Sequence, residues 1–360
     1  MKVGIYDVYD GVEMPHQKIY EKILTYNHIP FSHLNIRDED FWEKLRNVDI
    51  LMYKWPNNDK QHLLSDVLRP LFDSLKIKFF PDTPTSWHYD DKVKQYFLSL
   101  NHDMNPVPSN IFFHKEKALE FIDSAYYPLV VKLRKGAGSA NVMLVKNKQQ
   151  AVRYVKKAFS RKGISPLYFG SVKQLFKTMD SNMIETAVFY LKVIKRRLEN
   201  RDMAYWERQK NYVYFQKFLP GNEYDTRVTT VGRRVHAFRR FVRKNDFRAS
   251  GGEEWDINPD KIDRNLLRKA LCYSLRMGFQ SMAYDFIYDE QGEPRLIELS
   301  YLYGQPGYPD FMNGYWDEDL NWIEGRFWPQ HLELVDVLGI PDLKCPEIEV
   351  PRKWMKNRII

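Results

Sequence analysis

Two carboxylates lie close together in the stretch DFIYDEQGEPRLIELS, residues 285–300. It reads as two short strands around a tight turn, in which Gly292 supplies the positive φ that such turns need. If Gln291-Gly292 is the loop, Asp285 and Glu298 face each other directly, with Cβ atoms about 5 Å apart. Like charges placed in this way repel. A bound Mg2+ would remove the repulsion, because it takes one or two carboxylates and completes its shell with water and phosphate oxygens.

The same register places Ser300 beside Glu298, where its hydroxyl adds an oxygen. The opposite face then carries the apolar residues of a core, namely Tyr284, Phe286, Tyr288, Ile297 and Leu299. The alternative to a metal is that two of the chain's many arginines neutralise the carboxylate pair.

A second hairpin, DTRVTTVGRRVHAFRRFV, turns at Gly232-Arg233. In that register Asp225 faces Arg240, and Arg227 lies on the same side of the sheet. Arg248 follows shortly after, in NDFRAS. Clustered guanidinium groups suit phosphate or carboxylate ligands. The alternative is a solvated basic face, since surface ion pairs are common and weak.

The third stretch is RKGAGSANV, residues 134–142, with strand signals on both sides. It lacks the Gly-Lys-Ser/Thr ending of a Walker loop and the last glycine of GxGxxG. As a hairpin tip, its Gly136, Gly138 and Ser139 would bring backbone N–H groups close to phosphate oxygens. Lys132, just before the tip, could supply a fixed charge. An ordinary flexible hairpin is the alternative. Taken together, the three stretches specify a polyphosphate bound with a metal ion.

The elements that must position these residues follow a simple order. Residues 1–80 alternate strand and helix signals, which predicts a parallel sheet with helices on its faces, and Tyr53, Lys54 and Trp55 follow one of its strands. We expect an N-terminal α/β domain over 1–85, a linking helix and central lid subdomain over 86–215, and a catalytic subdomain with a Trp-rich tail over 216–360.

Composition sets the class of protein. The chain has 360 residues, 44% of them hydrophobic, which is ample for a packed core. Two cysteines suit a reducing compartment, and we expect a cytoplasmic protein because neither a signal peptide nor a membrane-spanning run is evident. Residues 161–210 hold eleven Lys/Arg against five Asp/Glu, so they carry most of the net charge of +8. Such localised charge argues against a nucleic-acid-binding surface spread over the fold.

The sequence resembles the ATP-grasp superfamily, most closely its RimK-like branch of carboxylate–amine ligases. The resemblance rests on DDKVKQYFL (90–98), YPLVVKLRKGAGSANVMLV (127–145), the long stretch 216–250 and AYDFIYDEQGEPRLIELS (283–300). It implies an α/β chain with α+β organisation in the ATP-binding part: an ATP-grasp fold behind an N-terminal parallel-sheet pre-ATP-grasp domain.

The resemblance also implies roles for single residues. Lys92 and Lys132 would bind the nucleotide, Glu223 its ribose, and Arg240 the transferring phosphoryl group. The hinge that reads adenine would be Gln216, Lys217, Phe218 and Leu219. Asp285 and Glu298 would hold Mg2+ or Mn2+. Ser300 departs from the family's usual Asn, which puts a second metal site in question.

The implied reaction has two steps. A substrate carboxylate attacks the γ-phosphate of ATP to give an acylphosphate and ADP, and an amine (or a thiol-type acceptor) then displaces phosphate. Positioning and charge neutralisation would carry catalysis, without a protein nucleophile. Two other classes stay open: a phosphotransferase that stops at phosphorylation, and a nucleotide-binding regulatory module without catalysis.

Substrates and partners are expectations of a broader kind. Arg227, Arg248 and the aromatic loop YLYGQPGYPD (301–310) are the expected contacts of a small, peptide or carbohydrate-linked acceptor. Residues 161–210 read as an enlarged helical lid, with contact to a membrane surface or an anionic polymer as the alternative. Trp316, Trp322 and Trp328 are candidates for a closing flap, and a homodimer stays open as well.

Overall fold

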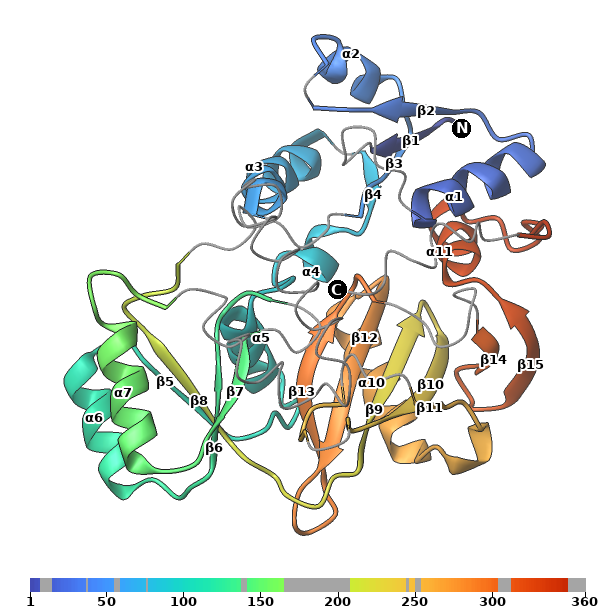
Figure 1. Cartoon of the computed structure of the whole chain (residues 1–360). Coiled ribbons are helices and arrows are strands. Elements are labelled where there is room, and N and C mark those ends of the chain that lie inside the picture. Colours follow the sequence, from blue (N-terminus) through green and yellow to red (C-terminus); the bar gives the residue numbers. More distant parts are fainter. Residues whose placement is uncertain are drawn as a thin grey trace, which may run out of the picture.

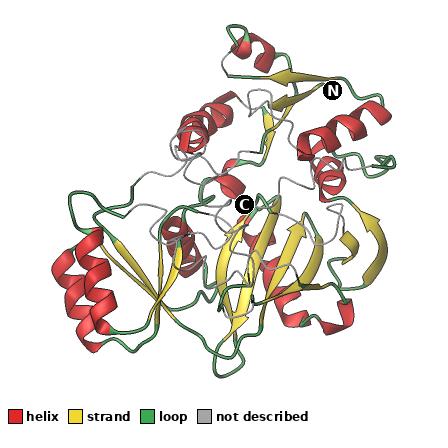
Figure 2. Cartoon of the chain, viewed as in Figure 1, coloured by secondary structure: helices red, strands yellow, loops and turns green. Residues whose placement is uncertain are grey.

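The computed structural model of the chain describes residues 1–6, 15–36, 38–54, 59–75, 77–136, 141–164, 208–243, 246–249, 254–303 and 312–348. Within these ranges three β-sheets are surrounded by helices (Figures 1 and 2). Gly138, Ser139, most of the basic segment 161–210 and residues 304–310 of the aromatic loop lie outside the described residues. No described helix is long and apolar enough to cross a membrane.

The N-terminal sheet is parallel, as the alternating pattern predicts, with strand order β2-β1-β3-β4. Its strands are β1 (Val3–Tyr6), β2 (Phe31–Leu34), β3 (Ile50–Met52) and β4 (Lys78–Phe80). The helices between them are α1 (Pro15–Tyr26), α2 (Phe41–Arg46) and α3 (Asp59–Leu75). The chain then leaves the sheet through a short helix, α4 (Thr83–Ser86).

The linking helix is α5 (Lys92–Asn101), which begins later than the predicted residue 86. Asp91 is its N-cap, and the Asp91 carboxylate accepts hydrogen bonds from the backbone N–H groups of Val93 and Lys94. This cap fixes where the helix starts, so Lys92 lies in its first turn. The side chain of Lys92 is buried there.

The middle sheet is antiparallel, with strand order β5-β8-β6-β7. Its strands are β5 (Ser109–Phe112), β6 (Leu129–Lys132), β7 (Val142–Val145) and β8 (Val213–Lys217). Helices α6 (Lys115–Ser124) and α7 (Lys148–Ala158) share an apolar core with this sheet and lie together along it in Figure 1. The glycine stretch joins β6 to β7, so it is a hairpin connection, as predicted.

The largest sheet has the strand order β13-β12-β9-β10-β14-β15, with β11 paired to β10. Its strands are β9 (Tyr224–Val231), β10 (Arg234–Phe241), β11 (Trp255–Asp256), β12 (Ser281–Tyr288), β13 (Pro294–Ser300), β14 (Met312–Trp316) and β15 (Trp322–Phe327). A 3-10 turn, η2 (Pro259–Lys261), leads into helix α10 (Arg264–Met277), which packs on one face of the sheet. The opposite face carries the charged residues discussed below.

The C-terminal part of the chain contributes to two cores. Trp316 and Trp322 pack against each other, with ring centroids 4.6 Å apart, at the core between the largest sheet and α10. Trp328 and helix α11 (Pro329–Leu338) instead complete the core of the N-terminal sheet. Trp316 and Trp328 are therefore core residues, Trp322 packs against the core, and α11 lies beside α1 (Figure 1).

A buried ion pair reinforces this junction. Lys54, which follows β3, lies 2.8 Å from Glu333 of α11, and their side chains are 4% and 0% exposed. The Glu333 carboxylate also accepts hydrogen bonds from the hydroxyls of Tyr20 and Ser281. Lys54 therefore has a structural partner, and Glu333 connects the N-terminal sheet to Ser281 of β12.

Candidate active site

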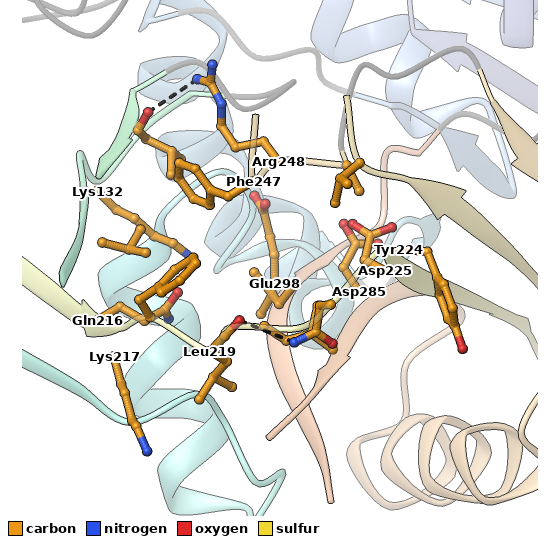
Figure 3. A pocket seen from close by; sticks show the side chains of 18 of the residues that line it. Lys132, Gln216, Lys217, Leu219, Tyr224, Asp225, Phe247, Arg248, Asp285 and Glu298 are labelled. Carbon is orange, nitrogen blue, oxygen red and sulfur yellow. Dashed lines mark hydrogen bonds between the residues drawn. The ribbon is translucent and has the colours of Figure 1, made fainter. Parts of the chain in front are cut away.

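A pocket lies between the middle sheet and the largest sheet (Figure 3). Ten of the residues singled out from the sequence line it: Lys92, Lys132, Gly136, Gln216, Lys217, Phe218, Leu219, Arg248, Asp285 and Glu298. Stretches as far apart as residues 92 and 298 therefore meet in one cavity. Arg227 and Arg240 adjoin it through the carboxylate of Asp285. Glu223 is exposed and is not among the lining residues, although its neighbours Asn222 and Tyr224 are.

Two buried lysines reach this pocket. The Lys92 ammonium donates to the carbonyl oxygen of Gly136 at 2.6 Å and lies 3.7 Å from a Glu298 oxygen. Lys132, the last residue of β6, is 4% exposed. Burial lowers the pKa of Lys132 to about 8, and the carboxylate of Glu298 opposes this effect only in part. In Figure 3, Glu298 lies at the centre of the pocket, between Lys132 and Asp285.

Part of the pocket has an apolar lining. Val130, Ile287 and Ile297 line it together with two phenylalanines. The Phe218 and Phe247 rings meet edge to face, with centroids 5.9 Å apart. Lys217 and Leu219, at and after the end of β8, also line the pocket.

Asn222 was not singled out from the sequence, yet it holds the hinge in place. Its side-chain amide donates to the carbonyl oxygens of Leu219 at 3.3 Å and Tyr288 at 2.9 Å, and its own oxygen accepts from the Tyr288 N–H. Asn222 therefore joins the segment after β8 to the end of β12. An asparagine directly after Gly221 in a tight connection was the available sequence signal.

The hairpin of β9 and β10 has the predicted register, in which Asp225 is paired with Arg240 and Arg227 with Phe238. Arg240 binds Asp225 through two hydrogen bonds of 2.7 and 2.6 Å, and its Nη2 also lies 2.8 Å from an Asp285 oxygen. Arg227 binds both oxygens of Asp285, at 2.8 and 2.9 Å. Two arginines and two aspartates thus form one network of alternating charge, in which Arg227 is partly exposed.

The pKa values of the two aspartates diverge within this network. Burial raises the pKa of Asp225, and Arg240 offsets the rise only in part. Burial acts in the same direction on Asp285, but Arg227 and Arg240 together hold its pKa well below the usual range. Asp285 is therefore ionised at neutral pH, with its charge balanced by guanidinium groups. Neutralisation by arginines, the alternative named above, is what the structure displays at Asp285.

The pairing of Asp285 with Glu298 is confirmed, whereas the predicted two-residue loop is wrong. The connection spans Asp289 to Glu293, and the Asp289 carboxylate accepts from two N–H groups within it. A β-bulge after Asp285 then shifts the register by one residue and restores the Asp285–Glu298 pair.

The bulge also corrects the predicted core face of β13. Leu296 is 2% exposed and packs in the core, whereas Ile297, predicted for the core, lines the pocket beside Glu298. Apolar residues at both positions made the shift invisible in the sequence.

The donors for a metal ion are fewer than the sequence suggested. Among the described residues no group of three or more His, Cys, Asp or Glu side chains is gathered as in a metal site. Glu298 faces the pocket with its side chain 32% exposed, whereas both oxygens of Asp285 bind arginines and the Ser300 hydroxyl donates to the carbonyl of Leu302. The Glu298 carboxylate, which has only the Lys92 ammonium nearby at 3.7 Å, could still hold Mg2+, because that ion needs only one or two protein carboxylates. Ligation by Asp285 and Ser300 stays a prediction.

Comparison with known proteins gives structural likeness only. No family model and no curated protein sequence matches the chain. An N5-carboxyaminoimidazole synthase from Aspergillus clavatus, solved with ADP and 5-aminoimidazole ribonucleotide, matches 85% of this chain and 71% of its own at a TM-score of 0.51 and 10% identity. The ATP-grasp ligase PsnB, complexed with a minimal precursor, matches 83% and 90% of the two chains at a TM-score of 0.50 and 13% identity. D-cycloserine synthetase DcsG matches 84% and 91% at a TM-score of 0.50 and 12% identity.

Proposed function

From the ATP-grasp fold of this chain, we propose that the protein is an ATP-dependent carboxylate–amine ligase that works through an acylphosphate. The observation that supports this most directly is the pocket itself. It brings two buried lysines, an apolar slot, a free carboxylate and an arginine–aspartate network to one place. The RimK-like branch is proposed from the sequence motifs alone.

The chain's own residues divide the proposed work. The slot beside Phe218 and Phe247 takes the adenine ring, and Lys92 and Lys132 bind phosphate oxygens. Mg2+, when bound at Glu298, would neutralise charge on the β- and γ-phosphates. The guanidinium of Arg240 stabilises the transferring phosphoryl group.

In the proposed reaction the substrate carboxylate oxygen bonds to the γ-phosphorus, and the bond from that phosphorus to the bridging oxygen of ADP breaks. The amine nitrogen then bonds to the acyl carbon and loses one proton to the departing phosphate, which leaves with the electron pair of the C–O bond. No protein group is covalently modified, so catalysis rests on placement and charge. An acceptor that is small or carbohydrate-linked is our proposal for the substrate class.

Thermal unfolding with ATP and Mg2+ tests the nucleotide site. A ligand present at 100 times its dissociation constant adds about 2.7 kcal/mol to the free energy of unfolding, which raises the melting temperature measurably. We expect ATP to stabilise the protein more with Mg2+ than without it, and Glu298→Gln to abolish that synergy. Glu324→Gln, an exposed position on β15, is the matched control and should keep it.

Either of two results would contradict the nucleotide site: no stabilisation of the wild type by ATP with Mg2+, or equal synergy in Glu298→Gln. Once ATP binding is established, carboxylates and amines can be screened for ADP release. Phosphorylation of the carboxylate that needs no amine, with a stable phosphorylated product, would favour a phosphotransferase instead.

The ionisation of Lys132 predicts how ATP affinity depends on pH. Its pKa is lowered to about 8, and bound phosphate favours the charged ammonium, so above pH 8 binding must take up a proton. We expect the dissociation constant for ATP to rise between pH 7.5 and pH 9.5, by at most about tenfold per pH unit. Titration calorimetry at these pH values measures this directly.

Lys132→Arg is the control for this pH dependence, because a guanidinium stays charged throughout the range. The variant should show a flatter profile than the wild type. An equal slope in both proteins would assign the pH dependence to another group.

A further inference from the structure

Two adjacent rows of side chains cross four strands on the charged face of the largest sheet. The first row consists of directly paired residues on β10, β9, β12 and β13: Phe238, Arg227, Asp285 and Glu298. The second row, two residues further along each strand, consists of His236, Thr229, Ala283 and Ser300. Side chains two residues apart on a strand share a face and lie about 7 Å apart. The second row is therefore one step from the network around Asp285.

Two polar atoms of this second row are buried without a hydrogen-bond partner in the part of the chain that the structure describes. They are Nε2 of His236 and Oγ1 of Thr229, and each side chain is 1% exposed. The two residues are directly opposite each other, with Cβ atoms about 5 Å apart. Buried polar atoms are nearly always hydrogen-bonded, so two orphans side by side indicate a missing partner.

The chemistry of that partner follows from the imidazole of His236. Its Nδ1 lies 3.0 Å from the carbonyl oxygen of Gly314, which can only accept, so Nδ1 carries the hydrogen. Burial lowers the pKa of His236 to about 4, although the bond to Gly314 opposes this, and the ring is neutral at pH 7. Nε2 is then a lone-pair acceptor, and its partner must bring an N–H or O–H group.

The neighbours of the two orphan atoms are small or apolar. Ala283 lies between Thr229 and Ser300 in the row and has the smallest side chain of the four. Phe238, 2% exposed, lies beside His236 with ring centroids 6.1 Å apart and gives the row an apolar wall. A ligand bound here would lie next to the first row, which contains Arg227, Asp285 and Glu298.

We propose that Nε2 of His236 and Oγ1 of Thr229 bind the acceptor amine of the reaction through its N–H groups. This inference rests on the proposed ligase function and assigns its second substrate to a particular pair of side chains. The two hydrogen bonds would hold the amine with its nitrogen lone pair toward the first row. They would also select acceptors that carry N–H groups.

The test uses the full chain labelled with 15N-histidine, with ADP and Mg2+ present. We expect one histidine with protonated Nδ1 and unprotonated Nε2 at pH 7, whose signals are absent from His236→Asn. Methylammonium chloride should shift its Nε2 resonance saturably. Tetramethylammonium chloride, which has the charge but no N–H, should not shift it.

Thr229→Val removes the hydroxyl at nearly constant volume, and we expect it to weaken methylammonium binding about tenfold, as for loss of one hydrogen bond. Thr226→Val, a buried threonine of the same strand on the opposite face, is the control and should bind as the wild type does. Stabilisation by ATP with Mg2+ shows that each variant is folded.

Three results would overturn the proposal: protonated Nε2 in the free protein, no response to methylammonium, or equal binding by Thr229→Val and Thr226→Val. The second result would mean that an ordered water, and no amine, is the partner of the two orphan atoms. Failure of ADP and Mg2+ to bind the wild type would instead remove the proposed function, so the two failures are distinguishable.

Discussion

Replacing Arg240 by methionine is expected to lower the free energy of unfolding by about 3–5 kcal/mol, the usual loss when one partner of a buried ion pair is removed. The reason is that Asp225 and Asp285, 6% and 7% exposed, would lose the guanidinium that they share, and among the described ion pairs only that of Asp285 with Arg227 would remain. Arg240 binds both carboxylates in the native protein. Urea denaturation at pH 7 measures the loss.

The neighbouring arginine is a matched control. Arg239 points to the opposite face, pairs with Asp256 and lies over the Tyr224 ring, 4.7 Å from its centroid. This pair is half-buried, with side chains 16% and 17% exposed, but it involves one carboxylate rather than two, so we expect about 1 kcal/mol from it and about as much again from the stacked cation. Arg239→Met should therefore cost about 1–2 kcal/mol.

Equal losses in the two variants would mean that the network around Asp285 does not stabilise the fold. A third variant, Arg240→Lys, separates charge from geometry. It keeps the positive charge but cannot bind two carboxylates as a fork, so its loss should lie between those of Arg239→Met and Arg240→Met.

In the β9–β10 hairpin, the turn residues and the alternation of side chains predict the complete pairing register. Gly232 has φ = 56°, as a two-residue turn with glycine requires, and every pair in the hairpin follows from that turn. The choice of Arg240 over Arg239 for the site side follows from the same register. Here local sequence and structure agree because nothing interrupts the ladder.

In the β12–β13 hairpin, the turn and the alternation of side chains do not suffice to predict the register. The prediction of Asp285 opposite Glu298 is correct because a longer connection and a bulge compensate each other. The bulge depends on how Leu296 fits the core against α10, which is a tertiary effect. Because Leu296 and Ile297 are both apolar, the sequence does not show which of the two side chains faces the core.

Long-range pairing was the other part that the sequence could not supply. Lys54 and Glu333 are 279 residues apart, and no local pattern connects them. The sequence did offer arginine neutralisation of Asp285 as an alternative to a metal. Which guanidinium groups reach it depends on the strand order β12-β9-β10, and that order was not readable from the chain.

Acid is expected to destabilise the protein strongly below pH 6.5, because three histidines are buried in the neutral form. Burial lowers the pKa of His16 to about 3, with Lys54 adding to the effect. It lowers the pKa of His88 to about 3, with Arg69 and Lys94 adding, and that of His236 to about 4. Their ordinary value in an unfolded chain is about 6.5.

The sign of the effect follows from proton uptake. Between pH 6.5 and the folded pKa values, the unfolded chain binds three protons that the native protein does not, so stability falls as the pH falls. At pH 5 each histidine costs about 2 kcal/mol, and the three together about 6 kcal/mol, which is comparable to the whole stability of many proteins. Asp225, whose pKa burial raises, acts in the opposite direction at lower pH, so pH 7.5 to 5 is the informative window.

Urea denaturation at pH 7.5 and pH 5 measures the difference, and His88→Leu should remove about a third of it. Both ring nitrogens of His88 are without partners among the described residues, and the ring packs against Phe279 at 5.4 Å, so an apolar side chain sacrifices no hydrogen bond of the ring. The exposed His114, changed to glutamine, should leave the pH dependence as it is. If His88→Leu and His114→Gln show the same slope as the wild type, the acid sensitivity belongs to carboxylates, and the neutral buried ring at His88 is not its source.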